Sequence, residues 1–220
     1  TALARDLGAQ LSPGEKLRIN LGDDPAAGLR QAQQLFLHFL VESDITLSDT
    51  DFYHKAVTKE WRLFYSHRSS QSLRDNLEGL LRYSNNFIAN QLFLTLGVQD
   101  SDYPATTKSA RAALQQQLAQ LYGDSFGRDP QSLLMLEGSG LSRTQRSSAA
   151  GMMHILEVFK PYADLLPEVD GVLRKSGTLT GVYNFAGYIL EPDGLYPFVI
   201  LTNQAVNNRL EILRVLRQEL

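Results

Sequence analysis

A β-hairpin is predicted by the sequence Arg174-Lys175-Ser176-Gly177-Thr178-Leu179-Thr180-Gly181-Val182-Tyr183-Asn184-Phe185-Ala186-Gly187-Tyr188. Gly181 marks the turn, and the residues after it are rich in the β-branched and aromatic types that favour strands. A third strand is expected at 196–202, followed by an amphipathic helix that closes the chain. Its inward side chains would be Val206, Leu210, Leu213 and Leu216, and its outward ones Arg209, Arg214 and Arg217.

Four residues at the head of this hairpin suit the binding of an acyl donor. Because side chains alternate along a strand, Lys175 and Gly177 should share one face and Ser176 and Thr178 the other. The lysine supplies positive charge, and the glycine lets a substrate backbone approach and pair along the strand. The two hydroxyls suit a carboxylate, and the Thr178 N–H suits an oxyanion. Taken alone, these residues favour a simpler interpretation, an edge strand with one exposed lysine.

A second motif, Ser84-Asn85-Asn86, interrupts an apolar helical pattern with three residues of poor helix propensity. Ser72 and Asp75 form the predicted capping box of the preceding helix. The pattern resumes after the motif and should end at Gly97. The motif therefore lies between two helices, and its simplest interpretation is a kink that Asn86 caps.

Three segments of this chain, in this order, resemble one branch of the penicillin-recognising serine acyltransferases. They are Ser84-Asn85-Asn86-Phe87-Ile88-Ala89, Glu137-Gly138-Ser139-Gly140-Leu141-Ser142 and Lys175-Ser176-Gly177-Thr178-Leu179-Thr180-Gly181. They are similar to the low-molecular-mass class C penicillin-binding proteins, the D-alanyl-D-alanine carboxypeptidase/endopeptidases. The middle segment does not satisfy Gly-x-Ser-x-Gly and is interpreted as a tight turn packed near the site.

The resemblance implies an α/β fold of the penicillin-binding-protein/β-lactamase type, in which helices flank an antiparallel sheet and a helical subdomain lies beside it. Residues 24–220 would be the C-terminal part of this transpeptidase-like domain, and residues 1–23 the tail of an inserted domain or a linker. The implied activity is acyl transfer on peptidoglycan stem peptides, with β-lactams as inhibitors and without a metal or organic cofactor. The implied location is the periplasm or another extracytoplasmic compartment.

The resemblance also implies roles for six residues. Ser84 would relay protons toward the leaving amine, between Lys175 and the lysine of the nucleophile, and Asn86 would bind the backbone carbonyl of the substrate. The substrate-binding residues would be Ser176, Gly177 and Thr178.

One motif of that family, Ser-x-x-Lys, is absent, because no serine of the 220 residues has lysine three positions later. We expect the nucleophile in an upstream part of the same protein, and residues 1–220 alone to be inactive. The alternative is a non-catalytic relative that binds cell-wall peptide or a partner protein. A β-lactamase would need a fast deacylating base, which the sequence does not identify.

Composition excludes several other classes. A net charge of −3 without a basic run disfavours nucleic-acid binding, and no apolar run is long enough to span a bilayer. The absence of cysteine excludes disulfides and thiolate metal sites. The four histidines show no metal-binding spacing, which disfavours a zinc hydrolase.

Overall fold

The computed structural model describes residues 25–51, 53, 58, 60–62, 66, 68–99, 105–123 and 132–219, and the expected segment 1–23 lies outside them. The chain divides into two compact units, residues 1–56 and 57–220. In the first unit, helix α2 (Pro25–Glu42) begins at the proline, whose fixed φ and missing N–H suit the first helical position. The candidate site lies in the second unit.

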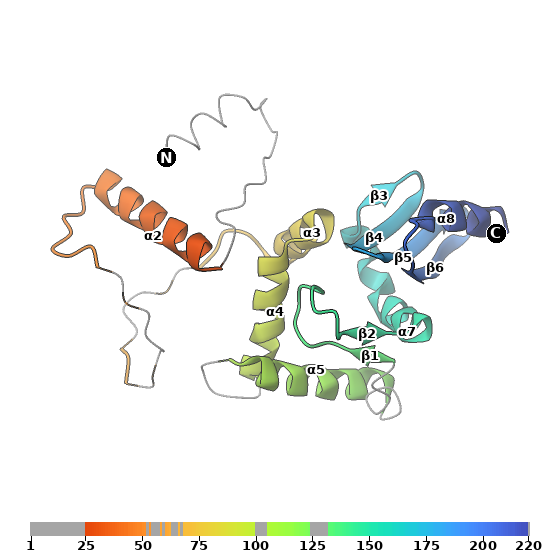
Figure 1. Cartoon of the computed structure of the whole chain (residues 1–220), viewed down its shortest axis with the longest axis horizontal. Helices are drawn as coiled ribbons and strands as arrows, with labels where there is room; N and C mark the ends of the chain where they lie inside the picture. The colour runs from red at the N-terminus through yellow and green to blue at the C-terminus, as the bar shows by residue number, and fades with distance from the viewer. Residues whose placement is uncertain are drawn as a thin grey trace. The chain divides into compact units, whose positions relative to one another are not determined.

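The second unit contains a four-stranded antiparallel sheet in the order β3-β4-β5-β6 (Figure 1). Its strands are β3 (Glu168–Val169), β4 (Val172–Leu179), β5 (Val182–Glu191) and β6 (Gly194–Asn203). The turn between β4 and β5 contains Gly181 with a φ of 74°, which confirms the predicted hairpin. A Cβ on Gly187 would lie 1.9 Å from the Leu173 carbonyl oxygen, so β4 and β5 approach too closely there for any side chain.

Each face of the sheet has its own hydrophobic core. Helix α8 (Arg209–Gln218) covers one face, where the buried side chains are Val172, Phe185, Ile189, Phe198, Ile200 and Leu213. Helix α7 (Ala149–Phe159) and the 3-10 helix η1 (Lys160–Leu165) cover the other, where the buried side chains are Leu156, Ala163, Leu166, Leu173 and Tyr188. The Tyr188 hydroxyl donates a hydrogen bond to the Leu156 carbonyl, so its polar atom is satisfied inside the core.

The expected orientation of the last helix is largely wrong. Leu213 is buried, but Val206, Leu210 and Leu216 are 71%, 60% and 37% exposed. The helix begins only at Arg209, so Val206 precedes it and the residues that face the sheet shift toward Leu213. Arg209, expected to point outward, instead lies over the Phe185 ring with its Cζ 4.4 Å from the centroid.

The helical part of the second unit consists of α3 (Leu73–Tyr83), α4 (Asn86–Gln99) and α5 (Thr107–Tyr122). The capping box of Ser72 and Asp75 is confirmed. The expected helix end at Gly97 is wrong, because α4 continues to Gln99. A Cβ on Gly97 would lie 2.6 Å from the Ala110 nitrogen, so this glycine allows α4 and α5 to pack closely.

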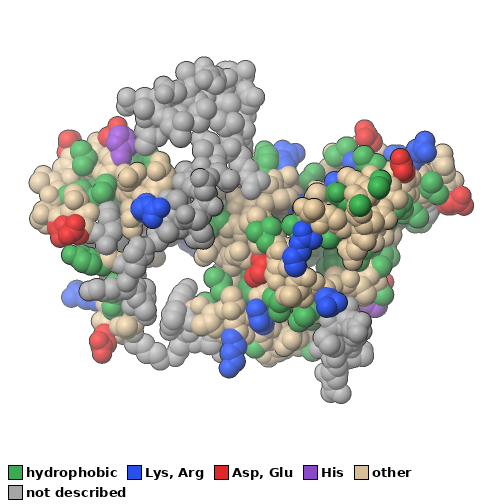
Figure 2. Space-filling model, in the orientation of Figure 1, with side chains coloured by type: hydrophobic (Ala, Val, Ile, Leu, Met, Phe, Trp, Pro, Cys, Tyr) green, Lys and Arg blue, Asp and Glu red, His purple; other side chains and the backbone are tan. Residues whose placement is uncertain are grey.

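Two short strands, β1 (Leu133–Leu134) and β2 (Arg146–Ser147), pair at the base of the loop that contains the Glu137 segment. In Figure 2, hydrophobic side chains are visible at the surface among basic and acidic ones. None of the helices in the described part of the chain combines the length and apolar character needed to cross a bilayer.

Candidate active site

Ser84 forms the corner between α3 and α4. Its φ of 51° and ψ of 52° place it in the left-handed region, where it ends α3. Residues other than glycine, asparagine and aspartate rarely adopt this conformation, and such strain often accompanies a functional role. The Asn85 side chain accepts a hydrogen bond from the Ile88 N–H at 3.0 Å, so Asn85 caps α4. The interpretation of Asn86 as the capping residue is therefore wrong.

Lys175 brings the two motifs together. It lies on β4, and its Nζ donates a hydrogen bond to the Ser84 Oγ and another, of 2.8 Å, to the Ser176 carbonyl. Partial burial lowers the pKa of the Lys175 amine below its ordinary value. An amine with a lowered pKa gives up its proton more readily, and this one is hydrogen-bonded to a hydroxyl.

Asn86 is the first residue of α4 and its side chain is exposed. Its amide has no hydrogen-bond partner within the described segments of the chain. An amide offers both donors and an acceptor, so Asn86 is available to hold a peptide group beside Ser84.

The strand that contains Lys175 has an open edge. β3 pairs with β4 only as far as Leu173, and the Arg174 N–H donates to the Pro167 carbonyl at 3.0 Å. Backbone groups alternate between the two edges of a strand, so those of Ser176 and Thr178 face the same edge as the Arg174 N–H. No strand among the described residues pairs with them there, so this edge is available for an extended peptide.

Gly177 is not required by the packing of the chain. A Cβ at this position would lie 3.6 Å from the Asn184 Cβ, an ordinary contact, and its φ is outside the left-handed region. At the position of a Cβ on Gly177, the described residues therefore make only ordinary contacts, and the glycine is not needed to relieve a collision among them.

The side chains of Ser176 and Thr178 lie on the face of the sheet covered by α8, opposite to Lys175 and Gly177, as strand alternation predicts. The Thr178 Oγ1 accepts a hydrogen bond from the Arg209 Nη1 at 2.8 Å. The structure thus joins Ser84 to Lys175 directly, and it places the Thr178 hydroxyl on the opposite face of the same strand.

The loop from Glu137 to Gln145 contains the third segment of the resemblance. The Glu137 carboxylate accepts hydrogen bonds from the Ser139 N–H at 2.6 Å and the Ser142 N–H at 3.1 Å, and from the Gln145 side chain. Burial acts to raise the pKa of Glu137, but these hydrogen bonds outweigh it and hold that pKa below its usual value. The carboxylate therefore stays ionised and fixes the loop around itself.

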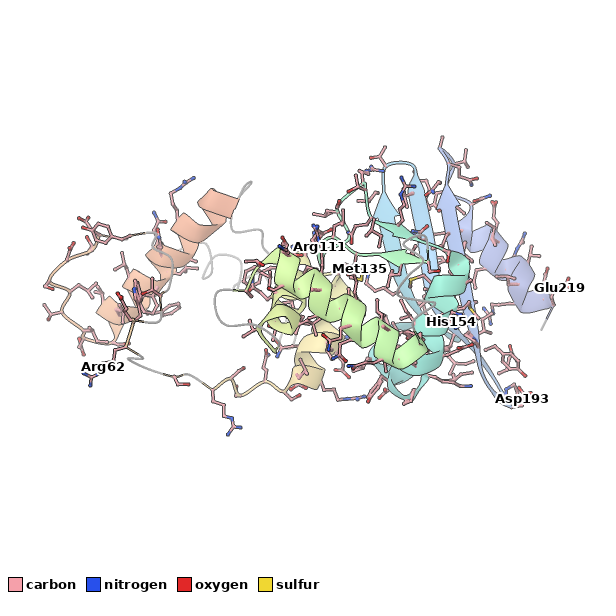
Figure 3. The ribbon with its side chains drawn as sticks, turned by 90° about the horizontal axis from the view of Figure 1, so that it is seen from below. Arg62, Arg111, Met135, His154, Asp193 and Glu219 are labelled. Carbon is pink, nitrogen blue, oxygen red and sulfur yellow. The ribbon has the colours of Figure 1, made fainter. Side chains whose placement is uncertain are left out.

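This loop connects α4 with the β4–β5 hairpin. The Asn90 Oδ1 accepts hydrogen bonds from the N–H groups of Gly138 and Ser139 at 2.8 and 3.0 Å. At the far end of the loop, the Arg143 Nη1 donates to the Thr180 carbonyl at 2.9 Å. Arg111 of α5 holds the start of the loop, because its Nε donates a hydrogen bond to the Leu136 carbonyl at 3.0 Å. Figure 3 labels Arg111 close to Met135.

Sequence reasoning did not identify the contacts of Asn90, Arg143 or Arg209. The position of Asn90 could have been noticed in the sequence, because it lies four residues after Asn86 and thus on the same side of the helix. No sequence pattern indicates the contacts of the two arginines, because their partners are backbone and hydroxyl oxygens distant in the sequence.

Comparison with known proteins identifies the family of this chain. Residues 23–167, more than half of the chain, match the D-Ala-D-Ala carboxypeptidase 3 (S13) family. The chain belongs to this family. The matched residues of the S13 chain include Ser84, Asn86 and the Glu137 loop, whereas Lys175 follows them. The resemblance to the class C penicillin-binding proteins is confirmed.

Among curated proteins, the S13 chain is 28% identical over 149 residues to the D-alanyl-D-alanine carboxypeptidase DacB of Haemophilus influenzae, covering 57% of this chain and 30% of the relative. Among solved structures, it is similar to penicillin binding protein 4 (dacB) of H. influenzae complexed with a β-lactam, with a TM-score of 0.55 and 23% identity. That likeness covers 66% of this chain and 40% of the other, and it confirms the expected fold class. The chain thus spans well under half the length of these relatives.

Proposed function

We propose that this chain is part of a serine D-alanyl-D-alanine carboxypeptidase/endopeptidase that cleaves peptidoglycan stem peptides through an acyl-enzyme. The hydrogen bond between the Lys175 Nζ and the Ser84 Oγ carries the proposal. It joins two motifs 91 positions apart in the sequence in the arrangement that a proton relay requires. Membership of the S13 family and the name of the DacB relative support the same activity.

The relay acts when the peptide bond breaks. A nucleophilic serine outside residues 1–220 attacks the penultimate D-alanine carbonyl, and the terminal D-alanine departs as an amine that needs a proton. The Ser84 hydroxyl gives its proton to that nitrogen, the Lys175 ammonium gives one to the Ser84 oxygen, and the proton that the attacking serine releases restores the Lys175 ammonium. Water then attacks the acyl-enzyme, which releases the shortened peptide and restores the nucleophile.

The remaining residues position the substrate. A peptide that pairs with the open edge of β4 passes over Gly177, which has no side chain. The Asn86 amide holds the backbone carbonyl of the substrate, and the Thr178 N–H lies on the edge where an oxyanion is stabilised. The hydroxyls of Ser176 and Thr178 bind its carboxylate, and β-lactams enter the same site and acylate the same serine.

The helix that contains the nucleophile is proposed to pack against α3 and α4. One aromatic side chain close to Ser84 is unusually exposed, since Phe87 is 72% exposed. Large exposed aromatic groups next to a binding site suit a packing partner. An enzyme that acts on the cell wall also belongs outside the cytoplasm, so we place this one in the periplasm or an equivalent compartment.

Labelled penicillin tests the proposal in the full-length protein. We expect a covalent adduct, and peptide mapping should place it on a serine outside residues 1–220 that is followed three positions later by lysine. Ser84→Ala should slow adduct formation, whereas Ser147→Ala, a matched change at an exposed serine of β2, should not. A labelled serine inside residues 1–220 would show that the site is misplaced. Absence of any adduct would support a non-catalytic protein that binds cell-wall peptide.

A further inference from the structure

Arg209 connects helix α8 with the strand of the candidate site. The two protons of its Nη1 are shared among three acceptors, the Thr178 Oγ1 at 2.8 Å, the Gly177 carbonyl at 3.1 Å and the Asn184 carbonyl at 3.3 Å. Its guanidinium stacks on Phe185, which is only 5% exposed. Gly177 and Asn184 oppose each other in β4 and β5, so one guanidinium nitrogen lies over this pair of residues.

The hydrogen bond to Thr178 has a fixed direction. An arginine side chain has only donors, so in this hydrogen bond Arg209 donates and the Thr178 oxygen accepts. The hydroxyl proton of Thr178 cannot point toward the guanidinium, and it finds no other acceptor in the described part of the chain. Thr178 is exposed, so its proton is directed outward, where it can be donated to an acceptor on a ligand.

The positive charge of Arg209 is not neutralised by the described residues. All of its hydrogen-bond acceptors there are uncharged oxygens, and its Nε and Nη2 groups donate to none of those residues. The adjacent Arg174 also lies over Phe185, with its Cζ 4.8 Å from the ring centroid, and adds a second positive charge that Asp170 partly balances. The environment of the Thr178 hydroxyl therefore favours an anionic acceptor over a neutral one.

We propose that Arg209 is a positioning residue for recognition of the substrate carboxylate: it fixes the Thr178 hydroxyl as a donor and adds positive charge beside it. This inference rests on the proposed function, in which the terminal D-alanine carboxylate lies at the β4 edge. Helix α8 thus contributes to specificity although none of its residues lies at the Ser84–Lys175 contact.

The test compares acylation of the full-length protein by a fluorescent penicillin with a free carboxylate and by its methyl ester. Hydrogen bonds to charged groups contribute enough that Arg209→Met should slow acylation by the acid about 10- to 100-fold. Acylation by the ester should change less than about twofold, because the ester presents no anion. Arg214→Met, at an exposed position of the same helix, should leave both rates unchanged and serves as the matched control.

Variants at Thr178 separate positioning from a general structural effect. Thr178→Val should reduce selectivity for the acid as strongly as Arg209→Met, and Thr178→Ser should retain it. The double variant should lose less selectivity than the product of the two single losses, because Arg209 acts partly through the Thr178 hydroxyl that Thr178→Val removes. Thr178→Val leaves the stacking of Arg209 on Phe185 in place. Its acid and ester rates therefore still test the role of the hydroxyl if the Arg209→Met variant does not fold.

Three outcomes overturn the inference. Equal losses for acid and ester would indicate a structural effect, additive losses at the two positions would exclude action through Thr178, and full selectivity in Thr178→Val would exclude the hydroxyl. If the wild-type protein forms no adduct at all, the proposed function fails and this inference fails with it.

Discussion

The two structural parts that meet at the candidate site are built differently. The centre of the sheet is buried on both faces, with Tyr188 and Ile189 at 0% and 1% exposure, and the sheet supplies Lys175. Helices α3 and α4 supply Ser84 and Asn86, yet α3 has no buried residue and Phe87 is 72% exposed. The sheet side is thus stabilised by its own core. We expect the helical side to gain much of its packing from the proposed nucleophile-bearing helix.

The largest expected effect tests whether the two parts act as one catalytic unit. Ser84→Ala on the helical side and Lys175→Ala on the sheet side should each slow acylation by penicillin roughly 10²–10⁴-fold, the usual loss of an acid–base group. The double variant should be no slower than the worse single one, because both belong to one relay. Lys108→Ala, at an exposed lysine of α5, is the control. Stopped-flow acylation rates measure this, and multiplicative losses would show two independent roles.

Gly187 on β5 and Gly177 on β4 allow a structural and a functional role of glycine to be compared within the sheet. Gly187→Ala should destabilise the protein by about 3 kcal/mol, because its Cβ would collide with the Leu173 backbone. Gly177→Ala should change stability by less than about 0.5 kcal/mol. It should nevertheless slow acylation on the order of 10²-fold, because it displaces the bound substrate. Urea unfolding and acylation rates together check both, and a stable, fully active Gly177→Ala variant would remove that residue from the site.

Truncating one apolar side chain in each part tests whether a further helix covers α3 and α4 in the full-length protein. Ile189→Ala should cost about 2–5 kcal/mol, the usual cost of a core truncation. Phe87→Ala should cost about 3 kcal/mol or more if a further helix packs on it, and less than about 0.5 kcal/mol if it remains exposed. Chemical denaturation of the full-length variants separates these cases, and a near-zero cost at Phe87 would contradict the proposed packing.

The smallest expected effect concerns the pH dependence of the sheet side. Burial lowers the pKa of Lys175, so the unfolded chain holds this proton more tightly than the folded one. The resulting cost to stability is complete below the folded pKa and disappears as pH rises toward the ordinary lysine value of about 10.4. Wild type should therefore gain stability relative to Lys175→Met between neutral pH and about pH 10. A difference that does not change with pH in unfolding curves would contradict this.

Features that depend on neighbouring residues could be predicted from the sequence. The hairpin around Gly181 and the capping box of Ser72 and Asp75 follow from turn and cap chemistry within a few residues, and both are confirmed. The meeting of Ser84 with Lys175 does not follow from local patterns. It was expected only because the motifs resemble those of a family.

Features that depend on distant packing could not be predicted. Gly97 has the local pattern of a helix end, yet it lies inside α4 because α5 packs against it. Arg209 has the local pattern of a solvated helix residue, yet a cation–π contact with Phe185 holds it against the sheet. Neither partner is close in the sequence, so no window around either residue contains the reason.

The left-handed backbone of Ser84 sets a limit on engineering this protein. A glycine adopts that conformation without steric cost, so Ser84→Gly should raise the free energy of unfolding by about 1 kcal/mol while it removes the hydroxyl. A library screened for heat resistance alone would then enrich glycine or asparagine at position 84 and lose penicillin reactivity in the same step. Selection for thermal stability and selection for penicillin reactivity therefore favour different residues at position 84.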